Sequence, residues 1–341
     1  MSDRKALTRK DFISGQDVRW CPSCGDYAIL SVVQGLLPEI GVDKEKIVFV
    51  SGIGCSSRFP FYVNTFGFHT LHGRAPTVAT GIKLANPELD LWLVTGDGDG
   101  FSIGGNHMIH LLRRNPGIKV LLLNNRIYGL TKGQYSPTSP AGLKTKSSPG
   151  GSLDHPVNPC SLALGAEATF IARSTDKDLK HLAATLRVAA AHKGTSFVEI
   201  LQNCVIYNDG TWDEVYAKEK REEAQLLVEH GKPLRFGKDK AKGIRQKGFG
   251  FEIVVLGENG VTEGDLVVHD QSINDPAYHV LLSRLGCDSE GPMAMGVLRQ
   301  VARAPYEVQL DASIAEAKAK RPNAGLADLY RDFGKAPMWT V

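Results

Sequence analysis

LWLVTGDGDGFSIGG (residues 91–105) and IKVLLLNNRIYGLTKGQ (residues 118–134) decide the fold of this chain. Each stretch begins with a continuous apolar run, which is typical of a strand that is covered on both faces of a sheet. The first run ends in Gly96-Asp97-Gly98 and the second in Asn124-Asn125. Two buried strands that end in turn-forming polar residues indicate a parallel sheet with polar loops at one edge.

The pattern extends in both directions along the chain. We expect two further buried strands over residues 47–52 (IVFVSG) and 196–201 (SFVEIL). Helical spacing of apolar residues lies between the strands, over residues 27–37, 75–85, 107–114 and 175–191. Alternating strands and helices predict an α/β fold with a doubly wound, mostly parallel sheet, in which ligands bind at the carboxyl ends of the strands.

The polar strand ends predict a phosphate and magnesium site. Strands that run parallel and are joined by a helix bring Asp97 and Asn125 to the same edge of the sheet. A carboxylate and a side-chain amide are hard oxygen ligands that suit Mg²⁺ together with phosphate oxygens. Gly98 and Gly100 let backbone N–H groups approach the phosphates. A dinucleotide site would need G-x-G-x-x-G, which GDGDGF does not match.

GDG followed at this distance by NN resembles the diphosphate-binding domain of thiamine-diphosphate enzymes. The resemblance implies that Asp97, Asn125 and the backbone carbonyl of Ile127 hold Mg²⁺. In such enzymes a glutamate on a separate pyrimidine-binding domain activates the cofactor. Residues 1–206 provide elements for only one such domain, and the polar residues 207–341 look too poor in buried strands to form the other. We therefore expect the active site to be shared with a second polypeptide.

The six cysteines are too few for a disulfide scaffold in a chain of 341 residues, so each needs its own interpretation. Cys21 and Cys24 form W-C-P-S-C-G, which fits a redox pair, a zinc knuckle or an iron–sulfur site. No strand precedes Cys21, which argues against a thioredoxin-like pair. The isolated Cys55 and Cys204 favour a centre drawn from several loops, although zinc and iron–sulfur stay open. We interpret Cys160 and Cys287 as core residues.

The motifs WCPSCG, GIGCSSR, HTLHGR, GDGDGF and NNRIYGLTKGQYSPTSP, followed by a late cysteine, together resemble the β subunit of the 2-oxoacid:ferredoxin oxidoreductases over residues 10–210. The resemblance implies one [4Fe–4S] cluster held by Cys21, Cys24, Cys55 and Cys204. It also implies thiamine contacts from Ile53, Gly54, Cys55, Ser56, Gly98, Asp99, Gly129 and Leu130.

The activity implied by this resemblance is oxidative decarboxylation of a 2-oxoacid, with transfer of the acyl group to coenzyme A, or the reverse carboxylation. Thiamine acts as an electron sink, and the cluster passes electrons one at a time to ferredoxin. The implied partners are ferredoxin and an α subunit that carries the pyrimidine-binding domain, assembled as an αβ pair or a dimer of such pairs.

Three residues bear on the substrate. Arg58 follows Cys55 in the same turn, and its guanidinium suits the distal carboxylate of 2-oxoglutarate, although a surface or partner-contact role is equally open. His72 belongs to the H-G-R stretch, which the resemblance places near the cofactor. Lys132 in TKGQ is similar to the 2-oxoglutarate branch of the family. Pyruvate or another 2-oxoacid stays open as the substrate.

The composition limits the alternatives. Lys and Arg number 40 against 37 Asp and Glu, and the acids interleave with the bases after residue 207, which argues against nucleic-acid binding. Residues 1–20 contain no apolar leader segment, and no stretch approaches the roughly 18 apolar residues of a membrane span, so we expect a cytoplasmic protein. The other hypotheses are a non-redox thiamine-dependent decarboxylase subunit and a zinc-knuckle binding module.

Two segments depart from the alternating pattern of strands and helices. Residues 132–160 hold five prolines among glycines and serines, which indicates either a binding loop or a disordered insertion. Residues 207–341 are densely charged, with one clear strand at 251–256 and a few modest helices. We expect residues 1–206 to form the thiamine-diphosphate, magnesium and [4Fe–4S] domain, and residues 207–341 to form a charged C-terminal extension that serves as a partner arm or lid.

Overall fold

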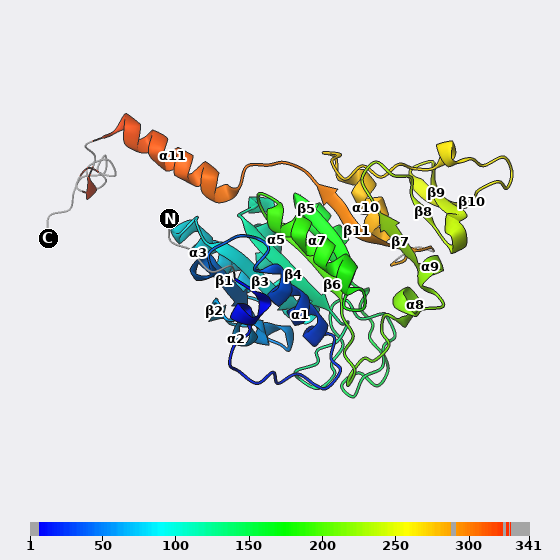
Figure 1. The fold of residues 1–341 in the computed structure, drawn as a ribbon, viewed down its shortest axis with the longest axis horizontal. Coiled ribbons are helices and arrows are strands. Elements are labelled where there is room, and N and C mark those ends of the chain that lie inside the picture. The colour runs from blue at the N-terminus through cyan, green and yellow to red at the C-terminus, as the bar shows by residue number, and fades with distance from the viewer. Residues whose placement is uncertain (1–6, 288–290, 323–324, 327, 329–341) are drawn as a thin grey trace.

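Eight strands form the central sheet, in the order β2-β1-β3-β4-β6-β5-β11-β7 (Figure 1). The structure is a computed structural model that describes residues 7–287, 291–322, 325, 326 and 328. All neighbouring pairs are parallel except β11 with β5. The strands are β1 (Ile47–Ser51), β2 (Phe66–His69), β3 (Asp90–Gly96), β4 (Ile118–Asn124), β5 (Phe170–Thr175), β6 (Ser196–Leu201), β7 (Gln225–Val228) and β11 (Met293–Gln300).

Helices cover both faces of the sheet. One hydrophobic core lies under α3, α5, α6 and α10, and the second lies under α1, α2 and α7. Val48 and Val50 of β1 face the first core, whereas Ile47 and Phe49 face the second, as the alternation of side chains along a strand requires. These helices are α1 (Asp26–Leu36), α2 (Phe59–Tyr62), α3 (Ala75–Ala85), α5 (Gly105–Arg114), α6 (Pro159–Gly165), α7 (Leu179–Ala191) and α10 (Ala277–Arg284).

The predicted doubly wound sheet is therefore confirmed. The four predicted strands are β1, β3, β4 and β6, and the predicted helices are α1, α3, α5 and α7, with ends that differ by a few residues. Short elements fill the connections: α4 (Asp97–Phe101), α8 (Asp213–Tyr216), α9 (Arg221–Ala224), and the 3₁₀ turns η1 (Arg9–Phe12), η2 (Lys44–Lys46), η3 (Ser56–Arg58), η4 (Lys238–Lys240) and η5 (Glu263–Asp265).

Strands β2 and β5 were not predicted, for different reasons. The residues of β2, FGFH, are all exposed at the sheet edge, so they do not form a buried apolar run. Strand β5 is wholly buried but contains Arg173, whose guanidinium lies 2.7 Å from Glu199 Oε2 on β6. A charged residue interrupts the apolar run by which a buried strand is recognised in a sequence. The sequence does not reveal that a buried partner on the neighbouring strand compensates the charge.

The prediction of only one clear strand after residue 207 was wrong. Strands β7 and β11 extend the central sheet beyond β5, and β8 (Arg235–Phe236), β9 (Lys242–Lys247) and β10 (Gly250–Val255) form a small antiparallel sheet. Residues Met293 to Met295 of β11 are buried. This short run lies in a polar neighbourhood and joins the sheet through β5, which is distant in sequence.

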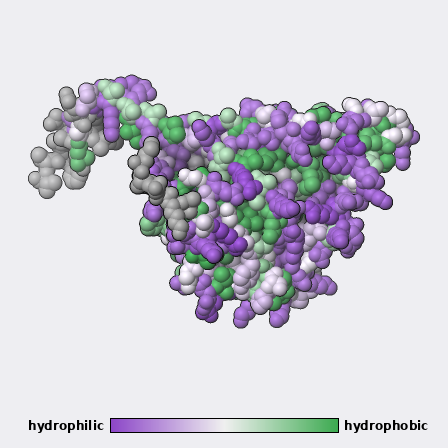
Figure 2. Space-filling view, in the orientation of Figure 1, coloured by the Kyte–Doolittle hydropathy of each residue, from purple (hydrophilic) through white to green (hydrophobic). Residues whose placement is uncertain are grey.

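Helix α11 (Tyr306–Lys320) projects from the body of the molecule (Figure 1). Its first turn is anchored because Glu307 is buried and accepts hydrogen bonds from the backbone N–H of Gly117. The projecting helix carries hydrophilic and hydrophobic side chains (Figure 2), including the exposed Val308 and Ile314. Within the described residues, no helix has the length and apolarity that a membrane crossing requires.

Candidate functional site

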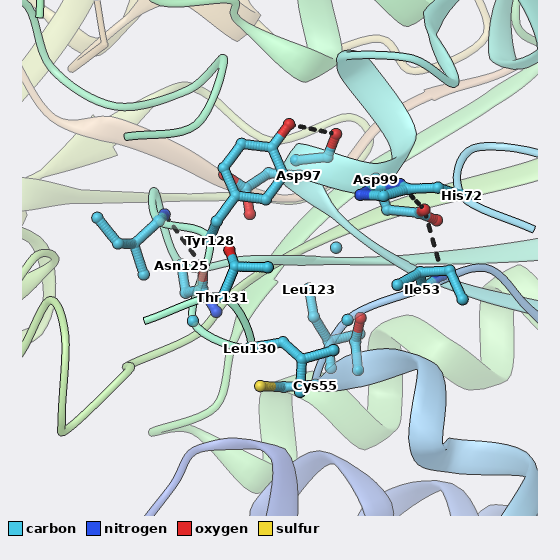
Figure 3. Close-up of a pocket in the computed structure, with 16 residues that line it drawn as sticks. Ile53, Cys55, His72, Asp97, Asp99, Leu123, Asn125, Tyr128, Leu130 and Thr131 are labelled. Carbon is cyan, nitrogen blue, oxygen red and sulfur yellow. Dashed lines mark hydrogen bonds and ion pairs between the residues drawn. The ribbon is translucent and has the colours of Figure 1, made fainter. Parts of the chain in front are cut away.

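The carboxyl ends of β1, β3 and β4 surround a cavity of about 80 Å³ (Figure 3). The parallel register brings the loops after these strands together, as the positions of the motifs predict. The residues that the resemblance assigned to thiamine or magnesium all line this cavity, together with His72. They are Ile53, Gly54, Cys55, Ser56, Asp97, Gly98, Asp99, Asn125, Ile127, Gly129 and Leu130. Gly100, which was predicted to face the phosphates, does not line it and packs beside Thr95 and Met108.

Asp97 is buried at the end of β3, where two hydroxyl groups hold its carboxylate. The Oδ2 atom accepts hydrogen bonds from Ser136 Oγ at 2.5 Å and from Thr138 Oγ1 at 2.6 Å. Burial raises the pKa of Asp97, and the two hydroxyls partly offset this effect. Both come from the proline-rich loop, so this segment packs against the site. Of the two alternatives for this segment, a disordered insertion does not agree with these contacts, and a binding role stays a prediction.

A chain of buried groups continues from Thr138 into the sheet. Thr138 Oγ1 also lies 2.9 Å from Asn124 Oδ1, and Asn124 Nδ2 donates to Glu199 Oε1 at 2.8 Å. Burial alone would raise the pKa of Glu199, but the adjacent Arg173 and the hydrogen bonds lower it, so the carboxylate stays charged. Glu199 thus fixes the orientation of the Asn124 amide by accepting its N–H group. The amide oxygen is thereby turned toward the Thr138 hydroxyl and helps to position it.

Asn125 and the residues after it form a tight turn. Asn125 Oδ1 accepts the backbone N–H of Ile127 at 3.2 Å, and Arg126 has a φ of 56°. Asn208 Nδ2 donates to the carbonyl of Asn125 at 2.9 Å and thereby fixes the turn. A carboxylate, an amide oxygen and a nearby backbone carbonyl are a donor set that fits Mg²⁺ shared with phosphate oxygens.

Asp99 connects two of the loops that line the cavity. Its Oδ1 atom accepts the N–H groups of Gly73 at 2.7 Å and Ile53 at 3.2 Å, and lies 2.5 Å from His72 Nδ1. Its Oδ2 atom accepts from Thr95 Oγ1 at 2.8 Å. The carboxylate is therefore occupied within the protein, and a cofactor contact by Asp99 stays a prediction. The pairing points the half-exposed ring of His72 along the cavity wall.

Tyr128 is a site residue that the sequence analysis missed. Its hydroxyl donates to the carbonyl of Gly98 at 3.1 Å, and its ring lies so close to Gly98 that a Cβ there would come within 2.3 Å of it. Glycine at this position is therefore required for packing against the ring. Tyrosine in the NNRIYG stretch was the only available signal, and a tyrosine after a strand has many other uses.

The four cysteines predicted to bind a cluster line a second cavity, of about 190 Å³. Cys21 and Cys24 precede α1, Cys55 follows β1, and Cys204 follows β6. The two cavities share Cys55, Asn125, Gly129 and Leu130, so one wall separates them. The predicted gathering of these cysteines from distant parts of the chain is thus what the structure shows, while their ligand role stays a prediction.

Gly129 lies beside two of the sulfurs in the cysteine cavity. No three His, Cys, Asp or Glu side chains in the described part of the chain converge closely enough to hold one ion. A Cβ on Gly129 would lie 3.5 Å from Cys204 Sγ and 3.6 Å from Cys55 Sγ, so glycine keeps the space between these sulfurs open.

The thiols near this cavity are shifted toward their neutral form. Burial raises the pKa of Cys55 to about 12, and it also raises the pKa values of Cys24 and Cys204. Asp26, which is buried beside them, adds to the upward shift for all three thiols. Since only thiolates ligate metals, assembly of a metal centre here must release protons.

Arg58 lies in the wall of the cysteine cavity and not among the residues of the first cavity. Its Nη1 atom donates to the carbonyl of Arg19 at 3.1 Å. Lys132 lines the same cavity. The structure therefore places both proposed substrate residues on the side of the cysteine cavity, and a role of Arg58 in binding a substrate carboxylate stays a prediction.

The remaining cysteines lie outside both cavities. Cys160 is fully buried in α6, and its thiol donates to Glu199 Oε2 at 3.2 Å. Cys287 packs beside a small core that contains Trp212, Met293 and Met295. These surroundings agree with the predicted packing role for the two residues.

Comparisons with known proteins agree with this site. Residues 52–200 match the family described as thiamine pyrophosphate enzyme, C-terminal TPP binding domain. The chain is 51% identical over 332 residues to the 2-oxoglutarate oxidoreductase subunit KorB of Mycobacterium tuberculosis, and the match covers 97% of this chain and 88% of that relative. It is 47% identical over 201 residues to the 2-oxoacid:ferredoxin oxidoreductase subunit beta of Saccharolobus solfataricus, covering 58% of this chain and 66% of the relative.

A solved structure is also similar over nearly the whole chain. It is the 2-oxoglutarate:ferredoxin oxidoreductase from Magnetococcus marinus with 2-oxoglutarate, coenzyme A and succinyl-CoA bound. The TM-score is 0.75 at 30% sequence identity, and the match covers 99% of this chain and 98% of the other. With the diphosphate loops and the four cysteines gathered at one edge of the sheet, this protein belongs to the β subunits of the 2-oxoacid:ferredoxin oxidoreductases.

Proposed function

We propose that this chain is the β subunit of a 2-oxoglutarate:ferredoxin oxidoreductase. The complex would convert 2-oxoglutarate and coenzyme A to succinyl-CoA and CO₂, with two electrons passed to ferredoxin, or run the reverse carboxylation. The names of the relatives and the ligands of the structural neighbour support this substrate. The observation that carries the proposal is the wall that the two cavities share, because an electron donor in one cavity and an acceptor in the other would be neighbours.

Thiamine diphosphate, when bound, supplies an electron sink for decarboxylation, and a [4Fe–4S] cluster supplies one-electron transfer. For this chain we propose that Asp97, Asn125 and the carbonyl of Ile127 hold Mg²⁺ and thereby the diphosphate. Residues of the turns after β1, β3 and β4 line the cavity and would contact the cofactor. His72 would orient polar groups at the cavity mouth, because Asp99 fixes its ring.

The cluster would be held by Cys21, Cys24, Cys55 and Cys204. Gly129 leaves room for it, and three of these cysteines, Cys24, Cys55 and Cys204, are partly buried. We assign the region after residue 207 to structural support of the sheet and to a partner arm, for which the projecting α11 is the candidate.

The proposed α subunit would dock at the edge strand β2. Phe66 and Phe68 expose 60% and 46% of their surfaces, and the neighbouring Leu71 exposes 75%. An unpaired sheet edge with a group of exposed apolar side chains is typical of an interaction surface. Leu71 directly precedes His72, so a partner bound here would close the thiamine cavity.

An anaerobic preparation of the co-purified αβ complex tests the proposal. We expect a brown protein with about four irons per β chain, bound thiamine diphosphate and Mg²⁺, and coenzyme-A-dependent dye reduction with 2-oxoglutarate. A colourless protein with stoichiometric zinc would instead support a non-redox decarboxylase subunit or a zinc-binding module. The Asp97→Ala variant should lose thiamine diphosphate but keep its iron, which separates the two cavities.

The substrate is tested by a second variant. Arg58→Ala should raise the KM for 2-oxoglutarate far more than the KM for pyruvate if Arg58 binds the distal carboxylate. Equal effects on both substrates would assign Arg58 to the support of the Arg19 segment, with which it is hydrogen bonded. Preference of the wild-type complex for pyruvate would reject 2-oxoglutarate as the substrate.

A further inference from the structure

Gln202 is a buried glutamine at the end of β6 whose side chain faces the cysteine cavity. It exposes 1% of its surface and follows directly on Leu201, the last residue of the strand. Its Nε2 atom lies 2.8 Å from the carbonyl oxygen of Asn203 and 3.3 Å from Cys24 Sγ. The side-chain amide of Gln202 therefore contacts a sulfur that we assign to the cluster.

The orientation of this amide follows from its neighbours. The carbonyl of Asn203 can only accept hydrogen bonds, so the side chain must present its NH₂ group to it. One N–H is then used by Asn203, and the second points to Cys24 Sγ. A flipped amide would place two oxygen atoms against each other. The Gln202 Oε1 atom has no partner among the described residues, so nothing on that side favours the flipped form.

The side chain also has little freedom to move away. A Cβ on Gly25 would come within 3.1 Å of Gln202 Cγ, so the glycine next to Cys24 packs closely against the stem of the glutamine. The carbonyl of Asn203 additionally accepts the backbone N–H of Gly25 at 3.3 Å. Residues 202 and 203 thus hold the segment of Cys24 through both the backbone and the side chain.

We propose that Gln202 is a positioning residue that sets the reduction potential of the cluster by donating a hydrogen bond to Cys24 Sγ. A donor to a ligating sulfur withdraws electron density and stabilises the reduced cluster, which carries one more negative charge. The hydrogen bond therefore raises the potential and makes the cluster a better acceptor of electrons from the thiamine side. This inference rests on the proposed cluster.

The test is a redox titration of the αβ complex, followed by electron paramagnetic resonance (EPR). Gln202→Met keeps the length and volume of the side chain but has no N–H donor. We expect a lower midpoint potential, with a severalfold change in the ratio of oxidised to reduced cluster at a given potential. A tenfold change corresponds to about 59 mV for a one-electron couple.

Gln34 offers a matched control. It is also buried, but its Nε2 atom donates to the carbonyl of Tyr62 at 2.9 Å and not to a sulfur. Gln34→Met removes a comparable hydrogen bond and should leave the potential unchanged. An intact cluster with the wild-type potential in Gln202→Met would overturn the proposal, as would an equal shift in the Gln34→Met control.

A measurement on the wild-type protein covers the case in which Gln202→Met does not retain iron. Pulsed EPR of the reduced complex, with ¹⁵N in its glutamine side-chain amides, should show a nitrogen coupled to the cluster. Absence of this coupling in a cluster-loaded complex would overturn the proposed role of Gln202 and leave the proposed function of the chain intact. A wild-type complex without iron would instead reject the proposed function, so the two failures are distinguishable.

Discussion

Replacing Thr138 with valine removes a hydroxyl from beside Asp97 and keeps nearly the same volume. The hydroxyl lies 2.6 Å from Asp97 Oδ2 and 2.9 Å from Asn124 Oδ1, and Thr138 is buried. A hydrogen bond to a charged group contributes about 1.5–3 kcal/mol. If that energy serves to hold the carboxylate for Mg²⁺, retention of the magnesium and thiamine diphosphate should weaken by about ten- to a hundredfold, at about 1.4 kcal/mol per factor of ten.

The pH dependence of cofactor binding should change as well. Burial raises the pKa of Asp97, and the Thr138 hydroxyl is one of the groups that offset this effect. Without the hydroxyl the pKa of Asp97 rises further, so a proton competes with Mg²⁺ up to a higher pH. We therefore expect binding in the Thr138→Val variant to be lost at a higher pH than in the wild type as the solution is acidified.

Isothermal titration calorimetry with thiamine diphosphate and Mg²⁺ on the αβ complex measures both effects. Thr138→Ser is the matched control, because it keeps the hydroxyl and removes only a methyl group, so its dissociation constant should stay close to that of the wild type. Equal weakening in the serine and valine variants would refute the reasoning, since the cause would then be packing. Unchanged affinity in the valine variant would show that Ser136 alone suffices to hold Asp97.

Two further perturbations follow from the structure. Gly129→Ala adds a methyl group 3.5–3.6 Å from Cys204 Sγ and Cys55 Sγ, which the protein tolerates in the absence of a cluster. The variant should fold, as circular dichroism would show, but purify with much less iron than the wild type; full iron content would place the cluster elsewhere. Burial lowers the pKa of His279 to about 4, and Arg299 adds to this effect, so the unfolded chain binds a proton at higher pH than the folded chain does. The free energy of unfolding should therefore fall by about 2 kcal/mol between pH 7 and 5 on account of this residue, and urea titrations of His279→Gln should show a correspondingly flatter dependence.

The sequence predicted those parts of the fold and the site that have a recognisable local pattern. Continuous apolar runs predicted β1, β3, β4 and β6, because strands buried on both faces have few polar side chains. Once those strands were taken as parallel, the GDG and NN motifs had to meet at one sheet edge, and they do. The four dispersed cysteines could be grouped only through the family resemblance, since spacing alone left zinc open.

The sequence was least informative where a polar residue is buried or an apolar one is exposed. Strand β5 was not predicted because Arg173 interrupts its apolar run. The charge can be buried there because Glu199 on the neighbouring strand compensates it. The exposed edge strand β2 has no alternation that would mark it as half-buried. The contribution of β7 and β11 to the central sheet depends on pairing with β5, and a short strand carries no sign of its partner.

By itself the sequence determined the fold class and the family, and it predicted most of the residues that line the two cavities, because these depend on periodicity and on motifs of a few residues. Only the tertiary structure decided which distant groups support those residues. Ser136 and Thr138 contact Asp97 from a loop without regular structure, and Gln202 contacts Cys24 although 178 positions of sequence separate them. Such contacts depend on the packing of the whole chain. A buried polar group needs a hydrogen-bond partner, and the local sequence pattern does not specify which residue provides it.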